Sequence, residues 1–130
     1  MGFILYIISL FLHIIFVPAG IVFGLIKAFY NARLVDGLKH ADAKFKKMAI
    51  GTDVYGNVFA EELFNYTLLS ANSEHKFGEY GITISAVLGH NQYHNTLSRT
   101  GKAIAFILDK IEKDHCLKAY LQTLSTHIYT

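Results

Sequence analysis

The chain has 130 residues, of which 52% are hydrophobic, and its formal net charge at pH 7 is +2. That small charge excludes the dense basic face of a typical nucleic-acid-binding domain, so no nucleic-acid partner is expected. The single cysteine, Cys116, excludes an intrachain disulfide. All acidic and basic residues lie from Lys27 onward. The apolar residues are therefore concentrated before it, and about a hundred residues remain to build one small domain.

The N-terminal segment from Gly2 to Ile26 contains 25 residues without a formal charge. A helix of this length extends about 37 Å and exceeds the roughly 30 Å hydrocarbon core of a bilayer. Tyr6 near one end, and Phe29 with Tyr30 near the other, suit the level of the lipid headgroups. We therefore predict a transmembrane helix over residues 1–30.

Two other interpretations of this segment are a buried helix of a soluble domain and a cleaved signal peptide. Buried helices are seldom this long and apolar. A signal peptide needs a basic residue ahead of a shorter apolar core, and none precedes the core here. The flank after the helix is basic, so the positive-inside rule predicts a single-pass protein with its N-terminus outside and its C-terminal module in the cytoplasm. The basic side chains expected at the membrane surface are Lys27, Arg33, Lys39, Lys44, Lys46 and Lys47.

Small residues form a stripe inside the predicted span, at Gly20, Gly24 and Ala28. Such stripes let two helix backbones approach closely, so this one is a candidate for self-association within the membrane. Pro18 removes one backbone donor and predicts a kink in the preceding turn. His13 is interpreted as a neutral side chain with a hydrogen-bond partner, since a charge there is costly.

Residues 31–48 are predicted to form a juxtamembrane amphipathic helix. Apolar side chains recur at helical spacing and basic ones fill the rest of its surface, which is typical of a helix lying at an anionic lipid surface. A linker helix with solvated charges is the alternative. The apolar stripe consists of Leu34, Leu38, Ala41, Phe45 and Met48.

The remaining residues, 49–130, are predicted to form a small, mostly helical module. Gly51 and Gly56 are expected to interrupt the helical pattern, and a further helix is expected over residues 53–65. Residues 71–81 contain two glycines and no long apolar run, so they are expected to form a loop. The whole chain is thus predicted to be mainly α.

The second half of the module has one clear helical pattern. A short apolar segment is expected to stop at Gly89, and residues 90–100 are expected to be turn-like. The clear helix follows, with Thr96 or Ser98 as its N-cap, whereas residues 117–130 carry no clear signal. Its packed face is predicted to contain Leu97, Gly101, Ile104, Leu108 and Ile111.

Seven histidines make a metal site the first chemistry to consider. His90 and His94 are four residues apart, which would place both on one face of a helix, and His115 or Cys116 would complete a site. The asparagine and glutamine residues between them argue against a stable helix, and two adjacent residues such as His115 and Cys116 point apart. His90, His94 and Cys116 are therefore weak metal candidates. Neither a metal, another cofactor nor a catalytic residue is expected.

Several short motifs lie between residues 48 and 118. They are Asp53-x-x-Gly56-Asn57-Val58, Leu63-Phe64-Asn65-x-Thr67-Leu68, His75-Lys76-Phe77-Gly78, Thr83-Ile84-Ser85-x-Val87-Leu88-Gly89, Leu108-Asp109-Lys110-Ile111 and His115-Cys116. Together they resemble a group of small, uncharacterised membrane-anchored proteins encoded by tailed bacteriophages and prophages. The resemblance implies a phage setting and no activity. An acidic residue usually precedes the Thr-Ile-Ser element in that group; Gly81 and Ile82 stand there in this sequence, so no role for that acid is carried over.

The expected function is that of a non-enzymatic, membrane-anchored accessory protein that tethers a small helical module to the inner membrane. A holin-like protein, which permeabilises the membrane by assembling through its transmembrane helix, is one alternative. A metal-dependent enzyme that uses His90, His94 and Cys116 is the other. The expected partners are the lipid bilayer, a protein bound by the module, and a second copy of the chain bound through the small-residue stripe.

Overall fold

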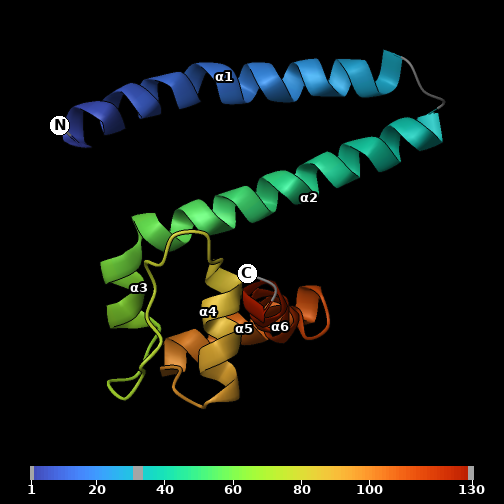
Figure 1. Cartoon of the computed structure of the whole chain (residues 1–130). Coiled ribbons are helices and arrows are strands. Elements are labelled where there is room, and N and C mark those ends of the chain that lie inside the picture. The colour runs from blue at the N-terminus through green and yellow to red at the C-terminus, as the bar shows by residue number, and fades with distance from the viewer. Residues whose placement is uncertain (1, 31–33, 129–130) are drawn as a thin grey trace. The chain divides into compact units, whose positions relative to one another are not determined.

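The computed structural model describes residues 2–30 and 34–128 (Figure 1). A long apolar N-terminal helix is followed by a smaller helical module, which confirms the predicted fold class. Within the described residues no strand forms, and the only pairing of extended backbone is an isolated antiparallel bridge between Leu69 and Leu97. The helices are α1 (Gly2–Tyr30), α2 (Leu34–Phe59), α3 (Glu61–Thr67), α4 (Ile84–Tyr93), α5 (Arg99–Ile111) and α6 (His115–Ile128).

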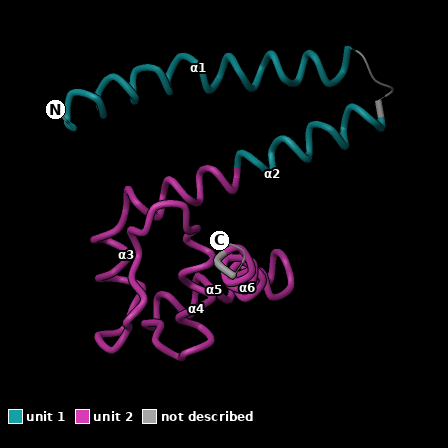
Figure 2. Tube along the Cα trace, viewed as in Figure 1, with its two compact units in different colours: residues 1–48 teal, residues 49–130 magenta. Residues whose placement is uncertain are grey.

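The chain divides into two compact units, residues 1–48 and residues 49–130 (Figure 2). The boundary falls inside α2, which continues through Gly51 and Gly56 to Phe59. The predicted interruption at these glycines is therefore wrong. A helical glycine costs only about 1 kcal/mol relative to alanine, which a long helix tolerates. The predicted start of the amphipathic helix, residues 31–33, lies outside the described residues.

Unit 1 contains α1 and the first half of α2. The most apolar 18-residue window of α1 has a mean hydropathy of 2.4, and none of that window is buried. The helix is therefore long and apolar enough to cross a membrane. It also continues through Pro18, because a single proline removes only one of the many backbone hydrogen bonds in a helix of 29 residues.

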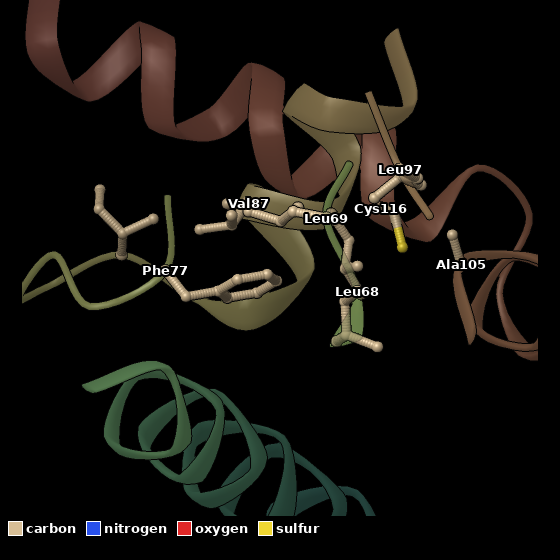
Figure 3. Packing of buried hydrophobic residues seen from close by; sticks show 10 residues of the cluster. Leu68, Leu69, Phe77, Val87, Leu97, Ala105 and Cys116 are labelled. Atoms are coloured by element: carbon tan, nitrogen blue, oxygen red, sulfur yellow. The ribbon is translucent and has the colours of Figure 1, made fainter. Parts of the chain in front are cut away.

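Unit 2 is built around one hydrophobic core. Val87 and Leu88 of α4 are completely buried, and Phe77 from the segment before α4 is 2% exposed. The labelled side chains of this core converge from the end of α3, the connecting segments, α4, α5 and α6 (Figure 3). The buried members are Leu68, Leu69, Phe77, Ile82, Ala86, Val87, Leu88, Leu97, Ala105 and Cys116.

Buried asparagines hold the long connection between α3 and α4. The side chain of Asn57 in α2 is fully buried; its amide donates to the carbonyl oxygens of Glu79 and Ile82 at 2.9 Å each, and its oxygen accepts from Gly78 N at 3.2 Å. Asn65 pairs with both backbone groups of Phe77. These bonds satisfy backbone groups that a loop would otherwise leave without partners. The loop predicted over residues 71–81 is confirmed.

The predicted helix stop at Gly89 is wrong. Helix α4 passes through Gly89 and ends at Tyr93, so residues 90–93 are helical. It stops because Asn95 adopts a left-handed conformation with φ of 56°, which asparagine tolerates better than most residues. The tail that carried no clear signal forms α6, whose backbone approaches α4 so closely that a Cβ at Gly89 would overlap the carbonyl of Cys116.

Helix α5 is the element that the sequence predicted best. The N-cap is Ser98, whose side chain accepts a hydrogen bond from Gly101 N at 3.0 Å. Gly101 and Leu97 are buried, and Ile104 with Leu108 packs on the core as expected. The predicted last member of this face, Ile111, is 80% exposed, because the helix ends there and the chain turns toward α6.

Candidate functional site

The predicted self-association stripe lies on α1, and part of it contacts α2 of the same chain. Ala28 is buried. The ammonium of Lys44 lies over Gly24, where a Cβ would overlap it, and donates to the carbonyl oxygen of Gly20 at 2.8 Å. A hollow of about 530 Å³ within unit 1 is lined by Phe23, Gly24, Lys27, Ala28, Asp36, His40 and Lys44. In this conformation the stripe contacts the chain's own second helix.

The basic residues predicted for the membrane surface fall on two helices. Lys27 is in the last turn of α1, and the others follow along α2. Lys44 is half-buried by its contact with α1, whereas the rest are exposed. Arg33 lies outside the described residues. The exposed set consists of Lys27, Lys39, Lys46 and Lys47.

A stack of three histidines is the most unusual side-chain cluster of unit 2. The ring centroids of His75 and His90 are 4.3 Å apart, and those of His90 and His94 are 4.5 Å apart. Tyr120 of α6 meets the His90 ring edge-on at 5.0 Å. Tyr93 contacts both His94 and Tyr120. We call His75, His90 and His94 the imidazole stack.

The central histidine of this stack has an unsatisfied nitrogen. His90 Nδ1 is buried and has no hydrogen-bond partner among the described residues. Burial lowers the pKa of His90 below its ordinary value of 6.5, and the neighbouring His75 and His94 lower it further. The fold therefore favours the neutral imidazole at this position.

The imidazole stack does not form a metal centre with Cys116. The rings of His90 and its neighbours lie against one another, tilted by 34° and 38°. Across residues 2–30 and 34–128 no three histidine, cysteine or carboxylate side chains are grouped so that they would hold a metal ion. Cys116 lies instead in the hydrophobic core, completely buried.

A second polar cluster joins α2, α4 and α6. Ser85 Oγ donates to Asp53 Oδ2 at 2.7 Å. His115 Nε2 lies 3.2 Å from Ser85 Oγ, and His115 Nδ1 lies 3.0 Å from Glu112 Oε2. All three hydrogen bonds are satisfied together when His115 carries a proton on both nitrogens. We call these four residues the Ser85 network.

The Ser85 network contains the groups of a serine nucleophile, an imidazole base and an orienting carboxylate. Its geometry differs from such a site in two respects. The hydroxyl donates to Asp53 instead of to His115, and Ser85 is only 5% exposed. Glu112, the carboxylate that would orient the base, is also exposed to solvent. The network therefore serves best as a polar joint between three helices.

Sequence reasoning missed most of these residues. It weighed His90, His94 and His115 and did not select His75, because no periodicity connects a loop residue to a helix 15 positions later. The Ser85 network also joins distant segments. One signal was available for it: Asp53, Ser85 and His115 each belong to one of the short motifs noted between residues 48 and 118.

No family model matches the sequence, and no curated protein or solved structure is significantly similar to it.

Proposed function

We propose that this protein is a non-enzymatic, membrane-anchored accessory protein. One observation carries the proposal: α1 is 29 residues long, strongly apolar, and unburied throughout its most apolar 18-residue window. A helix of this kind has no favourable environment in water, and a bilayer provides one. The positive charge that follows α1 supports an orientation with the N-terminus outside and unit 2 in the cytoplasm.

Insertion of α1 into lipid requires a rearrangement of Lys44. Gly20 lies about 15 Å along the helix from Tyr30, so an ammonium bound to its carbonyl would lie deep in the hydrocarbon. A cation there costs about 3 kcal/mol or more. On insertion α2 therefore leaves α1, and Lys44 joins the other α2 lysines at the headgroup level, where each adds about 1 kcal/mol of attraction to anionic lipid.

Unit 2 is proposed to bind a protein partner. Several large apolar side chains of unit 2 are exposed around α3 and on α5, where a partner could cover them. Phe59, Leu63 and Tyr66 around α3 are 64%, 61% and 89% exposed, and Phe106 with Ile107 on α5 is 61% and 57% exposed. A phage or prophage setting is proposed on the resemblance of residues 48–118 alone.

A holin-like function is the alternative that the small-residue stripe favours. Membrane permeabilisation separates it from anchoring. We expect the purified full-length protein, reconstituted into vesicles of anionic and zwitterionic phospholipid, to retain an entrapped dye for hours. Rapid dye release would instead support a pore-forming function, provided that Gly24→Leu abolishes the release. The matched lipid-facing change Val22→Leu should then leave the release intact.

A further inference from the structure

The imidazole stack occupies the place where three parts of unit 2 meet. His75 comes from the connection between α3 and α4, His90 lies on α4, and Tyr120 comes from α6. Helices α4 and α6 make the most extensive helix-to-helix contact among the described residues. A change in the position or charge of the His90 ring therefore affects the contact between α4 and α6.

Buried polar residues hold the stack in register. The amide of Asn91, itself fully buried, donates to the carbonyl oxygen of His75 at 2.9 Å, and the side-chain oxygen of Asn91 accepts from Ser73 Oγ at 2.5 Å. The side-chain oxygen of Asn91 accepts from Thr96 Oγ1 at 2.6 Å. With its backbone fixed in this way, His75 cannot easily swing away from His90 when charge appears on either ring.

Among the residues that the structure describes, the charged influences on His90 come from His75 and His94, and neither is acidic. The groups that face His90 are His75 from the connection, His94 from the end of its own helix, and Tyr120 from α6. Helix α5, which also packs on α4, presents Asp109, but that carboxylate accepts from Gln92 and from Cys116 N. If two neighbouring imidazoles of the stack are protonated, their positive charges lie about 4 Å apart. Only water then screens the repulsion between them.

We propose that the imidazole stack is an acid-sensitive latch: at neutral pH the uncharged rings hold α6 and the α3–α4 connection against α4, and protonation at mildly acidic pH opens this contact. The direction follows from linkage. The folded pKa of His90 is lowered, so the unfolded chain takes up a proton first as the pH falls. The stability that neutral His90 provides is present above about pH 6.5 and is lost below it.

Thermal unfolding of the full-length protein in uncharged detergent micelles tests the latch. Between about pH 7.5 and about pH 5.5, where aspartate and glutamate remain largely ionised, the midpoint of unit 2 should fall by on the order of 5 °C. His90→Phe retains an aromatic ring against Tyr120 and cannot take up a proton, so its midpoint should change little. His40→Phe, the matched change in unit 1, should retain the loss seen in the native protein.

Hydrogen exchange gives a second measurement that does not depend on a variant. After correction for the intrinsic pH dependence of exchange, amides around Tyr120 in α6 should lose protection at acidic pH more than amides around Ala105 in α5.

If His90→Phe does not fold, the double variant His75→Gln with His94→Gln replaces it in the thermal unfolding experiment and should reduce the shift in midpoint. The latch proposal is wrong if the unfolding midpoint of the native protein does not change between the two pH values. It is also wrong if the midpoint of His90→Phe falls as much as that of the native protein.

Discussion

At the scale of single residues, burial in the core determines the reactivity of the Cys116 thiol. Its side chain is completely buried in the first turn of α6. Burial, assisted by the negative charges of Asp109 and Asp53, raises the pKa of the thiol to about 12. The thiolate is the reactive form of cysteine, so both access and protonation oppose modification of this residue.

We expect the folded protein to resist thiol reagents. At about pH 8 the thiolate fraction of Cys116 is roughly one in ten thousand, so labelling by iodoacetamide should proceed only through opening of the fold. Mass spectrometry with and without a denaturing concentration of urea measures the two rates. Equal labelling in both conditions would show that the thiol is accessible and that the packing of α6 against the core is incorrect.

Single polar residues were also the least predictable part of the sequence. Asn57 and Asn91 are fully buried, yet nothing in their sequence neighbourhood distinguishes them from the exposed Asn72. Their partners are backbone groups of a loop up to 25 positions away, and pairing of this kind depends on the tertiary structure. His75 was missed for the same reason.

At the scale of elements, helices with a strong periodic pattern were predictable, whereas the role of a glycine inside a helical segment was not. Helix α1 follows from its apolar run, and α5 follows from its alternating apolar positions and its Ser98 cap. Gly51 and Gly89 were both interpreted as interruptions, and both lie inside helices. The sequence cannot distinguish a glycine that ends a helix from one that admits a neighbouring helix.

The two glycines should respond in opposite directions to alanine. Gly89→Ala places a Cβ against the carbonyl of Cys116 and should destabilise unit 2 by about 2 kcal/mol or more. Gly51→Ala meets no atom within 4 Å and should stabilise α2 by up to about 1 kcal/mol. Urea unfolding of both variants in detergent measures these changes. Destabilisation of similar size in both would contradict the close approach of α6 to α4.

At the scale of the whole molecule, one chain combines an apolar helix with a small folded module. Unit 2 has a single core drawn from α3 to α6, which suits a chain segment of this length. Helix α2 belongs to both units: its first half carries basic side chains in unit 1, and its second half contributes the buried Asn57 that holds the α3–α4 connection of unit 2. This division is the structural basis for the proposed tether.

The most direct measurement is retention of the full-length protein by membranes after washing with alkaline carbonate. The account predicts that the native chain stays in the membrane pellet and that Phe11→Lys with Ile15→Lys moves it to the supernatant, because each lysine at the centre of a span costs about 3 kcal/mol. The matched pair Thr100→Lys with Ala103→Lys, on the exposed side of α5, should leave it in the pellet. A native chain that remains soluble without detergent would contradict the account.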